Sequence, residues 1–342
     1  MSYEHKLKSA ARWLSLSMDS DFKPEQEAEL EKWLEKDLSN RQAFEEMSRV
    51  WNRFECLSHV YAKKDINIEE SDQAWHKDKP FQRLKNIFSS LYSLKFAFSI
   101  AVFGLIIFFC FPFIYKDSFE PLTSISVEYT KKGEQKNIIL DDGSVLEMNV
   151  NTLLIVEMSK KLRKIKLDKG EVFFKVSPDE KRPFEVVTPL CITRVLGTSF
   201  NVRNRKGQVS VDVKQGRVRV SACPSGLGDM RIQSLVLTGD RGVDIGADGR
   251  FAPLRKSSIN NVLAWKQGKV IFNNAPVSEI LEELELYHPV KIELKADEIK
   301  NSGISGSFYM RDLDETLSLI SIAASLKIEK KSEHLIILKS NS

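Results

Sequence analysis

This chain has few of the residues that catalysis and metal binding usually require. It contains five histidines and four cysteines among 342 residues. After Tyr115 the only histidines are His288 and His334, and neither lies in a nucleophile or metal motif. No glycine-rich phosphate-binding loop is present, and the carboxylates are scattered among lysines, so spacing identifies no glycosidase pair. The sequence therefore does not favour an enzyme, and it indicates no cofactor and no metal site.

A strong excess of either charge is also lacking. The formal net charge is +4, and before Phe96 the lysines and arginines do not outnumber the acidic residues. Nucleic-acid binding usually needs a basic surplus. We therefore expect no direct contact with nucleic acid.

The cysteines are spread thinly, at positions 56, 110, 191 and 223. In an oxidising compartment, Cys191 and Cys223 are candidates for one disulfide, because both lie in strand-like sequence. The alternative is that both are buried free thiols, which are common in protein cores.

One long apolar run contrasts with the charged sequence around it. The residues from Phe96 to Tyr115 carry no charge and lie between Lys95 and Lys116. As an α-helix, a run of about twenty residues rises about 30 Å, which is the hydrocarbon thickness of a bilayer. The run predicts a membrane-spanning helix over 96–115. Because it begins so far from the N-terminus, it predicts a retained anchor rather than a cleaved signal peptide.

The flanks of the run predict its orientation. Arg83, Lys85 and Lys95 precede it, whereas Lys116 alone follows closely. Positive residues near a membrane crossing tend to remain in the cytoplasm. We therefore expect a single-pass protein with its N-terminus in the cytoplasm and its C-terminal part on the other side.

Residues 1–60 have the pattern of three short helices, and residues 61–95 that of a charged linker. Ser39 and Gln42 form a capping pair before an apolar stripe, and Pro24 marks the start of another helix. A small bundle of this kind carries Trp13, Trp33 and Trp51. These tryptophans are either core residues or part of a docking face, since tryptophan is enriched where interfaces are strongest.

Residues 120–255 change to the alternating pattern of β-strands. Short runs rich in valine, isoleucine and phenylalanine are separated by turn residues. Asp141–Ser144 (DDGS) predicts a tight hairpin, and Lys214–Arg217 (KQGR) predicts a second turn. This part is predicted to be an all-β domain.

Residues 264–340 contain two successive strand, helix, strand patterns and a final strand over Leu335 to Leu338. The second helix has a capping pair, Asp312 and Glu315, before its apolar face. The pattern predicts a small α/β module. The final strand either closes the module's own sheet or offers an edge to a partner strand.

Five motifs carry a resemblance to a known family. LDDGSVLEMN, GEVFFKV, RPFEV, VLGTSFNV and VDVKQGRVRV occur in the order and approximate spacing of the outer domain of the FecR family, the membrane-bound regulators of iron-uptake sigma factors. The N-terminal bundle resembles that family's anti-sigma domain. The C-terminal module resembles the short periplasmic domain of secretins and TonB-dependent transducers. Together these features predict a multidomain chain: a helical bundle, one transmembrane helix, an all-β FecR-type domain and an α/β module.

The resemblance implies a function by binding and release rather than catalysis. It implies an inner-membrane anti-sigma factor that holds an extracytoplasmic-function sigma factor in the cytoplasm, with Trp13, Trp33 and Trp51 as candidate contacts. Its periplasmic part is expected to receive a signal from the signalling domain of a TonB-dependent outer-membrane transducer, in the uptake of iron or another nutrient. The nutrient, and whether the chain inhibits or activates its sigma factor, stay open.

The resemblance also implies one chemical step. Some members of the family cleave themselves at a Gly-Thr bond, which corresponds here to Gly197 and Thr198. The threonine hydroxyl would attack the preceding carbonyl to form an ester that then hydrolyses. The alternative is that Gly197 only supplies a turn between two strands.

Two other functions are kept as alternatives. A membrane-tethered periplasmic enzyme requires a polar cluster in a pocket of the β domain. A component of an outer-membrane assembly would instead use the C-terminal module to join a secretin or pilus complex.

Overall fold

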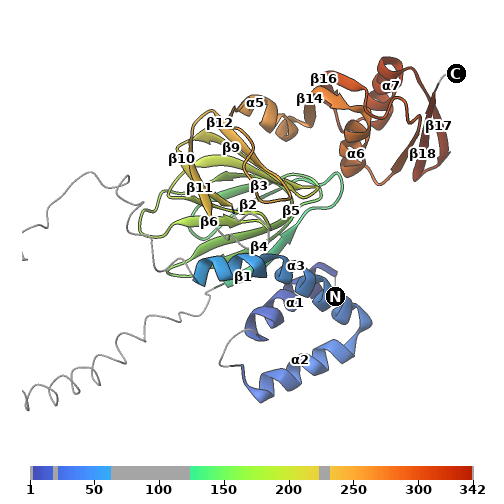
Figure 1. The fold of residues 1–342 in the computed structure, drawn as a ribbon. Helices are drawn as coiled ribbons and strands as arrows, with labels where there is room; N and C mark the ends of the chain where they lie inside the picture. Colours follow the sequence, from blue (N-terminus) through green and yellow to red (C-terminus); the bar gives the residue numbers. More distant parts are fainter. Residues whose placement is uncertain (1–2, 18–21, 63–123, 223–231, 341–342) are drawn as a thin grey trace, which may run out of the picture.

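The computed structural model of the chain describes residues 3–17, 22–62, 124–222 and 232–340 (Figure 1). The first part consists of three helices, α1 (Tyr3–Ser17), α2 (Pro24–Lys36) and α3 (Leu38–Ala62). The start of α2 at Pro24 agrees with the sequence pattern. The predicted cap of α3 is displaced, because Asp37 accepts a hydrogen bond from the Ser39 backbone N–H at 3.0 Å.

The second part is a thirteen-stranded β domain. Its strands are β1 (Ser124–Tyr129), β2 (Lys136–Ile139), β3 (Val145–Met148), β4 (Leu153–Met158), β5 (Arg163–Lys175), β6 (Phe184–Val187), β7 (Cys191–Val195), β8 (Ser199–Arg205), β9 (Gln208–Gln215), β10 (Arg217–Ala222), β11 (Gln233–Thr238), β12 (Arg241–Ile245) and β13 (Arg255–Lys256).

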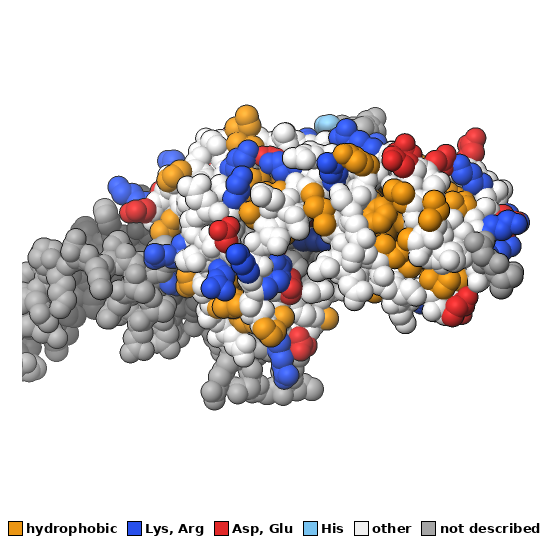
Figure 2. Space-filling model, turned by 90° about the horizontal axis from the view of Figure 1, so that it is seen from above, with side chains coloured by type: hydrophobic (Ala, Val, Ile, Leu, Met, Phe, Trp, Pro, Cys, Tyr) orange, Lys and Arg blue, Asp and Glu red, His pale blue; other side chains and the backbone are white. Residues whose placement is uncertain are grey.

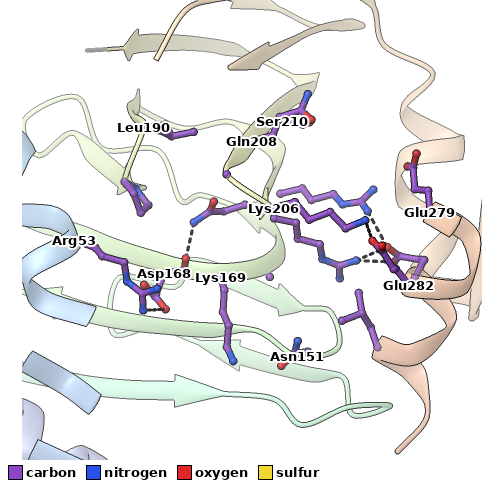
Figure 3. Close-up of a pocket in the computed structure, with 18 of the residues that line it drawn as sticks. Arg53, Asn151, Asp168, Lys169, Leu190, Lys206, Gln208, Ser210, Glu279 and Glu282 are labelled. Atoms are coloured by element: carbon purple, nitrogen blue, oxygen red, sulfur yellow. Dashed lines mark hydrogen bonds and ion pairs between the residues drawn. The ribbon is translucent and has the colours of Figure 1, made fainter. Parts of the chain in front are cut away.

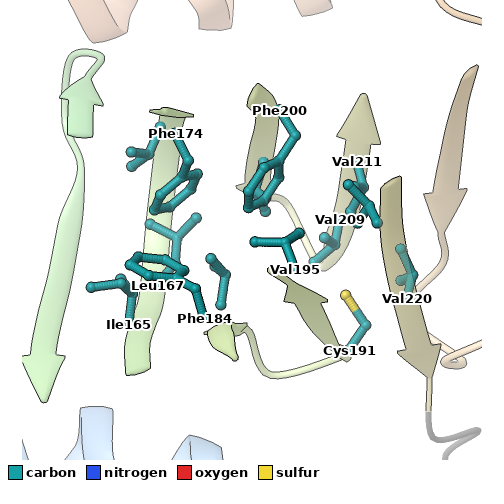
Figure 4. Close-up of a cluster of buried hydrophobic side chains, with 14 of the residues drawn as sticks. Ile165, Leu167, Phe174, Phe184, Cys191, Val195, Phe200, Val209, Val211 and Val220 are labelled. Atoms are coloured by element: carbon teal, nitrogen blue, oxygen red, sulfur yellow. The ribbon is translucent and has the colours of Figure 1, made fainter. Parts of the chain in front are cut away.

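Strand β5 is long enough to take part in two ladders. Its first half pairs with β4 and, in parallel, with β6, whereas its second half pairs with β3 and β8. In the strand order β11-β10-β7-β6-β5-β8-β9-β12-β13, β5 therefore connects the two ladders. The apolar side chains of both ladders meet in one core (Figure 4), in which the rings of Phe174 and Phe200 stack at 5.1 Å.

The two turn signals of this domain have different outcomes. The hairpin predicted at Asp141–Ser144 is confirmed, since β2 and β3 pair on either side of it. The turn at Lys214–Arg217 joins two strands that do not pair with each other: β9 pairs with β8 and β12, and β10 with β7 and β11. Gly216 allows this corner because its φ is +95°.

A short connection leads to the C-terminal module. It contains α5 (Ile259–Val262) and the 3-10 helix η3 (Leu263–Gln267). The elements of the module are β14 (Lys269–Pro276), α6 (Val277–Tyr287), β15 (Lys291–Lys295), β16 (Gly303–Tyr309), α7 (Leu313–Ala324), β17 (Leu326–Ser332) and β18 (Leu335–Ser340).

The module has two small sheets with α6 and α7 packed against them. β14 pairs with β16, and β18 lies between β15 and β17. The capping pair is confirmed: Asp312 Oδ1 accepts a hydrogen bond from the Glu315 backbone N–H at 2.9 Å. The final strand closes the module's own sheet, so its position leaves no edge of β18 open for strand addition.

The predicted membrane-spanning helix must be corrected. Within the part of the chain that the structure describes, no helix is long and apolar enough to cross a membrane. The linker 61–95, apart from its first two residues at the end of α3, and the whole apolar run 96–115 lie outside the described residues. The described residues therefore form a helical bundle, a large β domain and an α/β module, and none of their helices is a transmembrane element.

The predicted placement in the inner membrane, with the two ends of the chain in different compartments, is corrected as well, because it rested on that helix. Helices α1 and α3 share one hydrophobic core with the β domain, in which Met47 and Phe54 lie with Ile155 and Val187. Burial of apolar surface holds the two parts together. The bundle and the β domain are therefore in direct contact in the structure.

Candidate functional site

The three tryptophans do not form one common face. All three are half-buried. Trp33 and Trp51 pack against the core that the bundle shares with the β domain, and Trp13 is not part of that cluster. The ring of Trp51 is covered by the β-domain residue Lys166, whose Nζ lies 3.5 Å from the ring centroid. Trp51 is thus engaged within the chain.

The accessible surface of the bundle lies instead on α2 and at the start of α3. None of the side chains of α2 is buried, and α2 lies away from the β domain (Figure 1). Leu38 is 70% exposed, although large apolar side chains usually avoid water. Five exposed glutamates accompany it on α2, at positions 25, 27, 29, 31 and 35. Sequence reasoning missed Leu38 because an isolated leucine before a cap carries no periodic signal.

Gly197 and Thr198 lie between β7 and β8. Gly197 does not have a positive φ, so a left-handed turn does not explain this glycine. Close packing does: a Cβ at this position would lie 2.7 Å from Pro178 Cα. Thr198 is buried, and its hydroxyl donates to the Arg217 carbonyl at 3.0 Å. A side-chain base within hydrogen-bonding distance of this hydroxyl is absent from the contacts of the described residues.

A fully buried arginine, Arg163, holds the loop whose Pro178 packs against Gly197. Arg163 Nη1 donates to Asp142 Oδ2 at 2.9 Å, and its other bonds go to the carbonyls of Ser177, Asp179 and Arg182. The Asp179 N–H in turn donates to the Leu196 carbonyl at 2.8 Å. Arg163 therefore joins the hairpin turn and the Pro178 loop to the segment that carries Thr198.

A cavity of about 940 Å³ lies where the β domain meets α6 (Figure 3). Its walls come from β5, from the β8–β9 turn and from α6, and Arg53 of α3 lies at its side. Arg53 Nη2 pairs with Asp168 Oδ2 at 2.8 Å, and burial raises the pKa of Asp168 despite this pair. Several of its charged residues are paired with one another, so the cavity lies at a junction between parts of the chain.

The other predicted site residues give no catalytic or metal centre. Cys191 is a buried free thiol, and Cys223 lies outside the described residues. The register partner of Cys191 on β10 is Ala222. His288 Nε2 lies 2.6 Å from the Met310 carbonyl. Among the described residues, no three His, Cys, Asp or Glu side chains are grouped as metal ligands would be.

Comparison with known families gives three separate matches. Residues 126–219 match the FecR protein family, residues 269–337 match the family FecR, C-terminal, and residues 8–50 match a domain of unknown function, DUF4880. The matched ranges fall in the β domain, the C-terminal module and the helical bundle. No curated protein matches the chain.

Two solved structures are also similar. Both are crystal structures of a protein from Parabacteroides distasonis described as a candidate anti-sigma factor. Each is 26% identical in sequence with a TM-score of 0.55, and each match covers 64% of this chain and 100% of the other. The likeness therefore extends over the whole of the related protein's solved chain.

Proposed function

Because this chain belongs to the FecR family of anti-sigma regulators, we propose that it binds a sigma factor of the extracytoplasmic-function class through its N-terminal helices. In the same proposal, its C-terminal module receives the signal of a TonB-dependent transducer, and the pathway serves the uptake of iron or another nutrient. The chain acts by binding and release.

The exposed surface of α2 is the observation that carries the sigma-factor proposal. A sigma factor binds DNA, so its contact surfaces are rich in basic residues. The five exposed glutamates of α2 offer the complementary charge, and Leu38 offers an apolar contact that water would otherwise cover. Trp33 lies half-buried on the same helix. Trp51 can contact the sigma factor only if the bundle separates from the β domain.

The test is binding of the full chain to the extracytoplasmic-function sigma factor encoded beside it. Leu38→Asp is expected to weaken binding by about tenfold or more, as loss of a central interface residue does. Ile139→Asp is the matched control, because Ile139 is 76% exposed on the β domain, away from α2. Equal affinity of the two variants would argue against the α2 surface, and no binding by the unmodified chain would remove the proposal.

Exposed apolar residues on the C-terminal module support the transducer proposal. Figure 2 shows hydrophobic side chains at the surface of this module. Ile271 and Tyr309 are exposed on the outer face of the β14–β16 sheet, and each of these strands pairs with only one other strand among the described residues. An open edge beside apolar side chains suits the addition of a partner strand.

The transducer proposal is tested with the signalling domain of the TonB-dependent transducer that is encoded near this chain. Ile271→Asp is expected to weaken its capture by the full chain. Leu254→Asp, at an exposed position between β12 and β13 of the β domain, is expected to leave capture unchanged. Undiminished capture by the Ile271 variant would place the contact elsewhere.

We also propose self-cleavage between Gly197 and Thr198. The close approach of Pro178 to Gly197 supports it, because crowding restricts the peptide bond that the hydroxyl must attack. Thr198→Val keeps the shape of the side chain but removes the hydroxyl, so one full-length band is expected on a denaturing gel. Thr198→Ser keeps a hydroxyl and should retain two fragments. An identical band pattern for both variants would exclude the step.

A further inference from the structure

The C-terminal module contacts the β domain at two places of different character. At η3, Trp265 is buried, its carbonyl accepts from Gln135 Nε2 at 3.0 Å, and the neighbouring Lys266 pairs with Glu147 at 2.5 Å. At α6, the contact is made mainly by charged side chains of β8 and the turn after it (Figure 3). The first contact belongs to the connecting segment, and the second to the module itself.

Glu283 is the centre of the α6 contact. Its carboxylate accepts from Arg203 Nη2 at 2.8 Å and from Arg205 Nη1 at 2.6 Å, and its side chain is only 7% exposed. Burial alone would raise the pKa of Glu283, but Arg205 and Arg203 outweigh burial and lower it. The carboxylate is therefore held charged inside the junction.

Weaker contacts surround this centre. The Tyr287 hydroxyl donates to Asn149 Oδ1 at 3.4 Å, and the Gly133 N–H donates to the Leu286 carbonyl at 3.0 Å. Lys206 pairs with Glu282 at the rim, where both side chains are more than half exposed. Apart from Val150, which packs into the module's core, the junction relies on polar contacts.

Two features make this junction easier to separate than the hydrophobic cores. The cavity beside it is not filled by side chains, and Arg205 Nη2 is buried without a hydrogen-bond partner among the described residues. A buried ion pair contributes little net stability, because desolvation offsets the attraction. Removing one partner nevertheless costs stability, because the other charge is left buried and unpaired. We therefore expect the whole contact to form or to separate as a unit.

We propose that α6 is a releasable latch. In the closed state, described above, Glu283 bonds to Arg203 and Arg205. In the open state, α6 leaves β8 while η3 stays bound, and the module turns about the connecting segment. A ligand that binds the module only when it is open shifts the chain to that state. The latch itself does not depend on the proposed function. Its use as a relay, in which opening of the module changes the affinity of the chain for the sigma factor, rests on that function.

The pair of Lys206 and Glu282 can be used to measure how much of the protein is in the closed state. A carbodiimide activates an exposed carboxylate, and an amine in contact with it then forms an amide while the reagent leaves as a urea. In the closed state this amide joins residues 206 and 282 across the junction, and mass spectrometry of the digested full chain measures its yield. The exposed pair of Lys330 and Asp314, 2.7 Å apart within the module, reports whether the module is folded.

Glu283→Gln is expected to reduce the yield of the 206–282 amide by about fivefold, with the 314–330 amide unchanged. Glu293→Gln is the control, because Glu293 pairs with Lys295 on the surface of β15, and it should alter neither amide. An unchanged 206–282 yield in Glu283→Gln would overturn the latch.

Arg205→Gln keeps the test decisive if Glu283→Gln disturbs the module. This change leaves the module's sequence intact and removes the same contact from the β-domain side. It should also lower the 206–282 yield, and an undiminished yield refutes the latch. Sigma-factor affinity is measured on the same variants. An open latch with unaltered sigma-factor affinity disproves the relay and leaves the latch in place.

Discussion

The Nζ of Lys166 lies 3.5 Å from the centroid of the Trp51 ring and 2.5 Å from Glu157 Oε1. A residue of α3 thus covers a cation of β5, and the ring replaces water on one side of the ammonium group. Burial lowers the pKa of Lys166 even though Glu157 opposes the shift. This contact, together with the shared core, gives the bundle a defined position on the β domain.

The first prediction concerns this cation and ring. Trp51→Ala should destabilise the bundle on the β domain by about 2 kcal/mol, because a half-buried aromatic ring is lost. In a double-mutant cycle with Lys166→Met, the coupling should be about 1 kcal/mol, as for a partly desolvated cation over a ring. Urea unfolding followed by circular dichroism measures both values. Strictly additive effects would show that the two residues do not interact.

The second prediction concerns Arg163 and Asp142. Arg163→Met should destabilise the β domain by about 3–5 kcal/mol, because it removes the cation from a buried carboxylate that then keeps only its hydrogen bonds from Ser144, and it removes a donor from three carbonyls. Arg182→Met is the matched control. Arg182 pairs with Asp179 in a partly exposed position, so its loss should cost about 0–1 kcal/mol. Similar unfolding midpoints for the two variants contradict this role of Arg163.

Local features of this fold could be predicted from the sequence, since they depend on neighbouring residues. The cap at Asp312, the hairpin at Asp141–Ser144 and the strand and helix order of the C-terminal module are of this kind. Each rests on a pattern of a few residues whose conformational preference acts without distant partners.

Contacts between distant parts could not be predicted in this way. An apolar stripe on α3 shows that a face is buried, but it does not show that Ile155 and Val187 of the β domain cover it. Likewise, Glu283 and Arg203 are eighty positions apart, and no local pattern joins them. The membrane prediction used only the length and hydropathy of one run. It therefore could not foresee that the two flanking domains pack together.

The third prediction concerns the stability of the chain at acidic pH. Because the pKa of Glu283 is lowered in the closed state, its stabilising contribution is complete above its unfolded pKa, about 4.3. That contribution is lost as the pH falls through the lower folded value. Stability of the chain should therefore fall as the pH drops below about 4.3, and less steeply in Glu283→Gln. Unfolding by urea at each pH measures this. Identical pH profiles would mean that Glu283 is not the titrating group.

Other charged groups face the same junction. Those packed around Glu283 are Arg203 and Arg205 of β8, Lys206 of the turn, Glu171 of β5, and Glu279 and Tyr287 of α6. Glu171→Gln in the Glu283→Gln background separates the remaining buried carboxylate from the effect of Glu283.

The fourth prediction concerns Cys191. Burial raises the pKa of its thiol to about 11, although the hydrogen bond with Thr188 opposes the shift. Only the thiolate reacts with alkylating reagents, so iodoacetamide should label Cys191 in the native chain about a hundredfold more slowly than in the unfolded chain. Site-resolved mass spectrometry measures both rates. Comparable rates would show that the β7–β10 region opens readily.

The same labelling tests the predicted disulfide between Cys191 and Cys223. If Cys191 is a free thiol in the purified protein, unfolding without reductant is sufficient for complete alkylation. If it is bonded to Cys223, alkylation requires reductant, and the two cysteines then appear together in one peptide pair before reduction. The free thiol is the expected result, because Cys191 packs among the core side chains of the β domain and its sulfur lies 3.4 Å from the Thr188 hydroxyl.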